Sequence, residues 1–170
     1  MFFLISFVMM SLTSFAQEGH HGLDYGINLG YGFKVGTEGD DGRPLASLNV
    51  GKRFNEHFYV GGEFGVIISS LRTGKEETRY LPLLAVGRVY SNNSKVSPFT
   101  EGKVGFIFNT QADNGGQAHQ IGFAISEGLA IKASNKFDID LSAGYGHMFG
   151  LEHTGSKGCI LLTAGFKCHF

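Results

Sequence analysis

Every second residue is apolar along the C-terminal stretch of the chain, from Gly158 to Phe170. Because successive side chains of a β-strand point to opposite faces, this spacing predicts one wholly apolar face and one mixed face that carries charge. Strands of soluble sheets are usually about five or six residues long, whereas a strand that crosses a bilayer needs about nine to eleven. The stretch therefore predicts a membrane-crossing strand that ends on an aromatic residue. Its apolar face comprises Ile160, Leu162, Ala164, Phe166, Cys168 and Phe170.

The same alternation occurs in seven earlier stretches, of which residues 25–35 are the clearest. Longer and shorter polar connections separate the stretches in turn, as they do in outer-membrane barrels with long extracellular loops and short periplasmic turns. No window is apolar for the roughly 18 residues that a transmembrane helix needs. The pattern predicts an all-β, eight-stranded antiparallel up-and-down transmembrane β-barrel. The expected extracellular loops, through which an external ligand would bind, are residues 36–44, 69–79, 109–119 and 150–157.

The N-terminal segment differs from the rest of the chain. Residues 2–10 are almost entirely apolar, and Ser14 and Ala16 place small residues where a signal peptidase reads. The apolar run is too short to span a bilayer as a helix. We therefore expect a signal peptide over residues 1–16 that is cleaved after Ala16, an N-terminal tail over residues 17–23, and the barrel over residues 24–170.

Charge and cysteine content argue against a nucleic-acid partner and against a disulfide. The formal net charge is −1 and no Lys/Arg cluster is present, which argues against a nucleic-acid partner. The two cysteines, Cys159 and Cys168, lie nine positions apart on one expected strand, or roughly 30 Å at ~3.4 Å per residue. A disulfide requires Cα atoms within about 7 Å, so both thiols are expected to be unpaired.

Three sequence features resemble the outer-membrane protein β-barrel family of small eight-stranded OmpA/OmpX-type barrels. They are Tyr80-Leu81-Pro82-Leu83-Leu84, the segment Ser97-Pro98-Phe99-Thr100-Glu101-Gly102, and the terminal Phe170. The resemblance implies a location in the bacterial cell outer membrane, in contact with its lipid. It also implies assembly by the barrel-insertion machinery, with Phe166 and Phe170 in the assembly signal. The motifs carry no catalytic residues.

The alternation assigns a balanced set of charges to the lumen. Unpaired charges in a narrow, water-poor interior are costly, so a balanced set predicts a salt-bridged lumen. A barrel of eight strands is wide enough only to be filled by side chains. If Phe149 lies opposite Gly158, then Asp140 faces Lys167 across the last hairpin. The inward charges are Lys34, Arg53, Glu63, Glu101, Lys103, Asp138, Asp140 and Lys167.

Three further charges are assigned to the lipid face. Lys52 and Arg88 each precede an aromatic residue by two positions near an expected periplasmic strand end, so their long side chains are expected to reach the headgroups. Glu127 lies within a strand, between Ile125 and Leu129, where a charge that faces hydrocarbon costs free energy. A bulge, a partner-binding face and a different register all remain open for Glu127.

The sequence gives little support for a catalytic site or a metal site. The chain has seven histidines, but no spacing among them matches a known ligand pattern, so we expect no metal and no cofactor. A hydrolase needs a base within hydrogen-bond reach of its nucleophile. The nearest pair, Ser142 and His147, is assigned to opposite faces of one strand.

The sequence thus favours a non-enzymatic integral outer-membrane barrel with a closed polar lumen and a structural or loop-mediated adhesion role. Two alternatives stay open. One is a small channel or lipophilic-ligand carrier across the outer membrane, and the other is a lipid-modifying outer-membrane enzyme.

Overall fold

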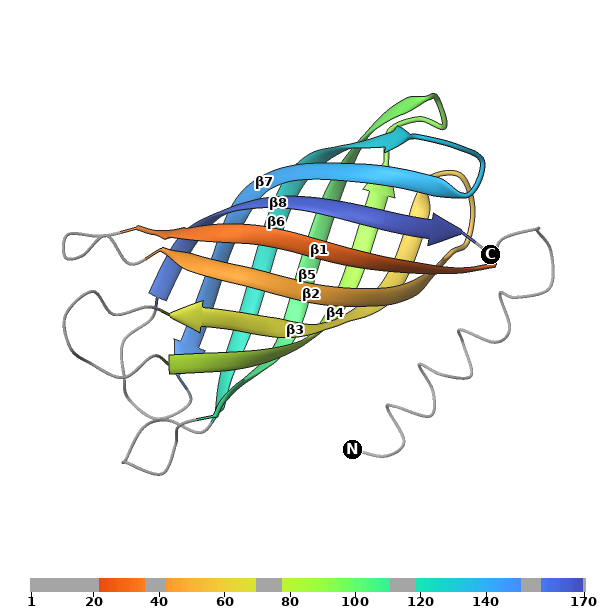
Figure 1. Ribbon diagram of the computed structural model, residues 1–170. Coiled ribbons are helices and arrows are strands. Elements are labelled where there is room, and N and C mark those ends of the chain that lie inside the picture. Colours follow the sequence, from red (N-terminus) through yellow and green to blue (C-terminus); the bar gives the residue numbers. More distant parts are fainter. Residues whose placement is uncertain (1–21, 36–41, 70–77, 111–118, 151–156, 170) are drawn as a thin grey trace.

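Eight antiparallel strands follow one another in chain order and close into a barrel, because β8 pairs with β1 as well as with β7. The computed structural model describes residues 22–35, 42–69, 78–110, 119–150 and 157–169. Figure 1 shows β1 lying between β8 and β2. The strands are β1 (Leu23–Lys34), β2 (Arg43–Arg53), β3 (Phe58–Ser69), β4 (Thr78–Tyr90), β5 (Val96–Asn109), β6 (His119–Lys132), β7 (Phe137–Gly150) and β8 (Lys157–His169). The predicted eight-stranded up-and-down barrel is confirmed.

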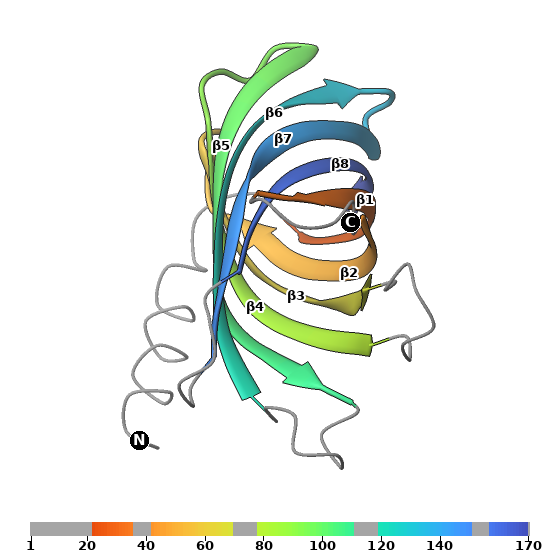
Figure 2. The ribbon, with the colours of Figure 1, turned by 90° about the vertical axis from the view of Figure 1, so that its left-hand side faces the viewer.

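The barrel closes through pairing of the C-terminal strand β8 with β1. Tyr25 pairs with Cys168 and Ile27 with Phe166, so the apolar faces of β1 and β8 form one continuous outer surface. Figure 2 shows the strands curving around a common lumen. None of the described residues forms a helix long and apolar enough to cross a membrane.

The outer face of the barrel is apolar on every strand. Soluble monomers rarely expose apolar patches above a few hundred Å². Here large apolar side chains are exposed all around the barrel, which suits contact with lipid acyl chains. They include Ile27, Leu29, Leu48, Phe64, Leu83, Val104, Phe106, Ile125, Leu141 and Ile160.

The two ends of the barrel differ. The turn end, as we call it, carries the described connections at residues 54–57, 91–95 and 133–136. The opposite end, where residues 36–41, 70–77, 111–118 and 151–156 join the strands, is called the loop end (Figure 1).

The expected loop limits need correction, because the strands run further toward the loop end than predicted. Arg43 and Pro44 belong to β2, where they pair with Gly32 and Tyr31. Residues 69, 78–79, 109, 119, 150 and 157 are likewise strand residues. The backbone ladder continues past the last clearly alternating side chain, since pairing depends on main-chain groups.

The faces predicted for β4 are wrong. Arg88 was expected to face lipid, and the alternation places Leu84, Val86 and Tyr90 on the same face as Arg88. Val86, Arg88 and Tyr90 are instead buried in the lumen, and Leu84 faces the same way. The exposed face is formed by the alternate residues, among them Leu83 and Val89. Both faces of β4 carry apolar side chains, so the alternation alone does not identify the outer one.

The expected register of the last hairpin is also wrong. Asp138, not Asp140, lies opposite Lys167, and Asp140 lies opposite Gly165. The shift is two residues, so every side chain keeps its predicted face while its partner changes.

Candidate functional site

Arg88 is one of several buried charges in the described lumen, and it has two carboxylate partners. Its Nη1 lies 2.5 Å from Asp140 Oδ2, and its Nη2 lies 2.6 Å from Glu101 Oε2. Nε also donates to Glu101 Oε2, at 2.9 Å. The side chain is only 5% exposed. A buried guanidinium with two carboxylate partners is held in one geometry by charge-assisted hydrogen bonds.

The strand order explains how Arg88 meets these two acids. Glu101 lies directly opposite Arg88 on β5, the neighbouring strand. Asp140 lies on β7 and reaches Arg88 through the lumen. The Arg88 guanidinium also lies over the ring of Phe99, with 3.9 Å between Cζ and the ring centroid. One side chain therefore joins two strands that are not neighbours.

Two lysines extend this arrangement. Lys103 Nζ lies 2.7 Å from Glu63 Oε2 and 3.1 Å from Glu101 Oε1. Lys167 Nζ lies 3.4 Å from Asp140 Oδ2 and 4.4 Å from the ring centroid of Tyr59. These ion pairs form one continuous network, the central cluster, which comprises Glu63, Arg88, Glu101, Lys103, Asp140 and Lys167.

Aromatic rings pack against the central cluster on the side of the turn end. Tyr59, Tyr90 and Phe99 are each 1–2% exposed. Glycine makes room for one of them: a Cβ at Gly128 would lie 2.4 Å from Phe99 Cζ. Tyr90 and Phe99 meet edge to face, with 5.9 Å between their centroids. Rings and charges together occupy this level of the lumen.

A second group of charges, the turn-end cluster, lies at the mouth of the lumen. His169 Nδ1 lies 2.8 Å from Asp24 Oδ1, and its Nε2 lies 2.9 Å from Asp138 Oδ2. Arg53 Nη2 lies 3.6 Å from the same Asp138 oxygen. Arg53 Cζ also stacks on the Tyr90 ring at 4.2 Å, which connects this cluster to the aromatic layer.

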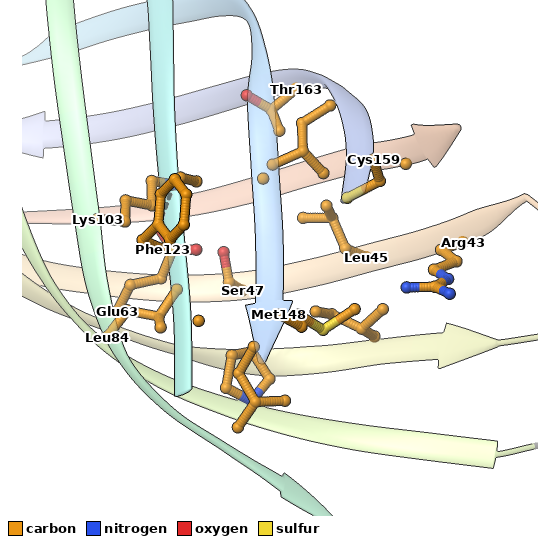
Figure 3. Close-up of a pocket in the computed structure, with 18 of the residues that line it drawn as sticks. Arg43, Leu45, Ser47, Glu63, Leu84, Lys103, Phe123, Met148, Cys159 and Thr163 are labelled. Carbon is orange, nitrogen blue, oxygen red and sulfur yellow. Dashed lines mark hydrogen bonds and ion pairs between the residues drawn. The ribbon is translucent and has the colours of Figure 1, made fainter. Parts of the chain in front are cut away.

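The lumen is apolar on the other side of the central cluster, toward the loop end. A cavity of about 80 Å³ lies there, and its floor includes Glu63 and Lys103. Figure 3 shows Leu45, Leu84 and Met148 around it. The apolar chamber, as we call this half of the lumen, is lined by Leu45, Ile67, Leu84, Ile107, Met148 and Leu161.

All seven residues predicted for the lumen charge network line the interior. Arg53 and Asp138 are in the turn-end cluster, and the other five are in the central cluster. Lys34, also assigned inward, lies half-buried near the loop end. Of the expected assembly signal, Phe166 is exposed on the outer face, and Phe170 lies outside the described residues, as do residues 1–21.

Sequence reasoning missed the charge at the centre. Arg88 was expected to face lipid, but its position opposite Glu101 could have placed it inside, because opposite charges favour cross-strand pairs. The alternation places His169 on the inner face of the C-terminal strand, but its pairing with Asp24 and Asp138 was not predicted. Arg43 was assigned to a loop, although extending the alternation back from Ser47 and Asn49 places it inside.

The outer face holds one polar contact where the sequence left alternatives open. Thr100 Oγ1 donates to the carboxylate of Glu127 at 2.9 Å, and the two residues lie opposite each other on β5 and β6. The ladder is continuous through Glu127 on both sides, so the residue does not mark a bulge.

The other candidate groups are not brought together. Ser142 shares a hydrogen bond with Thr163 on the inner face, whereas His147 Nδ1 contacts the Tyr145 hydroxyl at 2.9 Å on the outer face. Among the described residues, no three His, Cys, Asp or Glu side chains are grouped to hold a metal ion. Cys159 and Cys168 are both free, as predicted.

Comparisons with known proteins agree with this architecture. A family model described as "Outer membrane protein beta-barrel domain" matches residues 2–170. A search of curated protein sequences found no match.

Solved structures give the same result for the fold. Neisserial surface protein A (NspA) has a TM-score of 0.74 at 14% identity, over 89% of this chain and 100% of that chain. The outer membrane enzyme PagL has a TM-score of 0.61 at 12% identity, over 84% and 97%. Ail of Yersinia pestis, solved with the heparin analogue sucrose octasulfate, has a TM-score of 0.56 at 18% identity, over 91% and 100%. At these identities the likeness shows a shared fold.

Proposed function

Because this chain belongs to the outer-membrane protein β-barrel family, we propose that it is a non-conducting barrel of the bacterial outer membrane with a structural or adhesive role. The observation that carries the proposal is the central cluster. Arg88 connects β4 to β7 through the lumen, and Lys167 connects β8 to the rings on β3 and β4. Side chains from opposite walls therefore meet in the lumen, which supports a closed interior.

Charge pairing supports a closed resting state. Each carboxylate of the central cluster contacts at least one cation, and removing a single partner would leave a buried charge uncompensated. A channel that passes ions needs binding groups weak enough to release them. The five ion pairs of the central cluster, which share partners, do not provide this. The central cluster thus serves as a structural brace.

Solute uptake into liposomes tests the closed lumen. Vesicles that contain the folded protein are diluted into isotonic glycine or arabinose, and swelling is followed by light scattering. We expect swelling no faster than in protein-free vesicles. Swelling that depends on protein concentration would contradict the proposal and favour the small-channel alternative.

An adhesive role would reside in the segments that leave the loop end. The paired strands form a rigid scaffold, and the binding residues of such scaffolds are usually on the loops that the scaffold positions. The test compares attachment to host cells by bacteria that display the full chain or a variant in which residues 70–77 and 111–118 are replaced by short Gly-Ser linkers. Equal attachment by folded forms of both proteins would rule out these two loops.

A lipid-modifying activity is the rival function, because the outer membrane enzyme PagL has this fold. The separation of Ser142 and His147 by the barrel wall supports a non-enzymatic role. Incubation of the folded protein with lipopolysaccharide, followed by mass analysis of the lipid, tests this point. We expect unchanged acyl composition, and loss or gain of an acyl chain would establish an enzyme.

A further inference from the structure

The apolar chamber contains a cation that the ion-pair networks do not use. Arg43 is 5% exposed, and its Nε and Nη1 have no hydrogen-bond partner. Figure 3 shows its guanidinium turned inward, at the edge of the cavity beyond Leu45 and Met148. A buried charge without a partner costs free energy, whereas a ligand of opposite charge removes that cost.

No acid in the described lumen is available to pair with Arg43. Glu63, Glu101 and Asp140 are bound within the central cluster. Asp24 and Asp138 are bound to His169 at the opposite end of the barrel. The anion that completes this site must therefore come from outside the part of the lumen that the structure describes.

The walls define the rest of the ligand. Leu45, Ile67, Leu84, Ile107, Met148 and Leu161 present aliphatic groups to the cavity, and the polar floor is closed by the pair between Lys103 and Glu63. The cavity volume is about 80 Å³. A water-sized group needs about 10–15 Å³ of such space, so roughly five to eight groups of that size fit.

From these features we propose that the chamber binds a short-chain carboxylate, with the carboxylate on Arg43 and the alkyl chain among the aliphatic side chains. The planar guanidinium matches a carboxylate in a two-bond arrangement. A monoanion is favoured over a phosphate dianion, because burial of a second charge costs more than one guanidinium offsets. Since the central cluster closes the floor, the ligand enters and leaves through the loop end and does not cross the membrane.

Met148 gives a local probe for this site. It lines the chamber, and the other three methionines of the chain lie within the first ten residues. The full chain is labelled with ¹³C-methyl methionine, folded into phospholipid nanodiscs and titrated with hexanoate, hexan-1-ol or hexylammonium. The Met148→Leu variant identifies the Met148 signal.

Three variants separate the charge from the apolar contacts. Arg43→Gln removes the cation, Ala124→Leu fills the wall of the chamber, and Arg79→Gln removes an exposed cation near the same end that does not line the cavity. Migration on gels before and after heating shows that each variant is folded. Arg43→Lys keeps the charge and tests the contribution of the planar guanidinium. If Arg43→Gln does not fold, the comparison of hexanoate with hexylammonium in the wild type tests the charge.

We expect hexanoate to shift the Met148 signal saturably in the wild type and in Arg79→Gln. Arg43→Gln should weaken hexanoate at least 10-fold and hexan-1-ol less than 2-fold, and Arg43→Lys should weaken hexanoate less than 10-fold. Ala124→Leu should abolish both shifts. A Met148 signal that hexanoate does not move, or hexanoate affinity unchanged in Arg43→Gln, would overturn the proposal. Hexylammonium binding as strong as hexanoate binding would also overturn it.

Discussion

Arg88 and Asp140 are joined by a 2.5 Å ion pair between Nη1 and Oδ2, although 52 residues separate them in the sequence. They belong to β4 and β7, which have two strands between them along the shorter path around the barrel. The pair therefore forms only when β4 to β7 have assembled and curved around the lumen. Loss of the pair should therefore lower the free energy of unfolding of the whole barrel.

Replacement of Arg88 by Met should lower the free energy of unfolding by about 3–5 kcal/mol, because it leaves Glu101 and Asp140 with a buried, partly uncompensated charge. The measurement is urea unfolding of the protein in phospholipid vesicles, followed by tyrosine fluorescence, since the chain has no tryptophan. Lys136→Met, at an exposed turn position, is the matched control and should change the value by less than about 0.5 kcal/mol. Equal unfolding of the two variants would show that Arg88 does not brace the lumen.

The sequence predicted the barrel, its strand number and most of the lumen charges, but not Asp24, Arg43 or Arg88, because the outer face of most strands is distinctly more apolar than the inner face. It did not predict the position of Arg88. In β4 the inner face carries Leu84 and Val86, and the outer face carries Leu83 and Val89. Because both faces of β4 are apolar, only the neighbouring strand shows which face points into the lumen. Glu101 on β5, which lies opposite Arg88, could have identified the inner face.

Glycine positions give a second prediction. A Cβ at Gly128 would lie 2.4 Å from Phe99 Cζ and 2.6 Å from the Leu141 carbonyl oxygen, so Gly128→Ala should lower the free energy of unfolding by about 1–3 kcal/mol. Gly102 lies on the outer face, and a Cβ there would meet nothing within 4 Å. Gly102→Ala should be neutral or slightly stabilising in the same urea titration. If Gly128→Ala is no less stable than Gly102→Ala, the tight packing of Phe99 against β6 is wrong.

The register of the last hairpin can be tested by crosslinking. With Cys159 and Cys168 replaced by Ser, a cysteine pair at Ile139 and Phe166, which lie opposite each other, should form a disulfide on mild oxidation. A pair at Leu141 and Phe166 should not. Non-reducing gels give the readout. The reverse result would restore the register in which Asp140 lies opposite Lys167.

The predicted register was wrong because it placed Phe149 opposite Gly158, whereas His147 lies opposite Gly158. Alternation fixes which face a side chain occupies, but a shift of two residues leaves both faces unchanged. The ion pair of Lys167 with Asp140 nevertheless forms, diagonally and at 3.4 Å, since the long lysine side chain reaches past its direct partner Asp138. The apolar chamber and the lack of a partner for Arg43 could not be predicted from the sequence, because they depend on how side chains from several strands pack together.

Substitution of Glu127 is expected to raise the free energy of unfolding, unlike the substitutions of Arg88 and Gly128. Its carboxylate faces outward, where hydrocarbon is a poor environment for a charge, and Thr100 donates a hydrogen bond to it. Glu127→Gln keeps an acceptor for Thr100 and removes the charge, so it should raise the free energy of unfolding in vesicles by about 1 kcal/mol. Glu56→Gln, at an exposed turn position, should have no effect. A Glu127→Gln variant less stable than wild type would contradict a lipid-facing carboxylate.

Single-channel recording tests the central claim, that side chains close the lumen, most directly. The folded protein is added to a planar lipid bilayer in about 1 M KCl, and current is recorded at fixed voltages. At this salt concentration the Debye length is about 3 Å, so surface charges on the protein are screened. We expect a baseline without discrete steps from the wild-type protein, because Arg88, Lys167 and their acids join the walls of the barrel. Steady, discrete conductance from the purified monomer would contradict it.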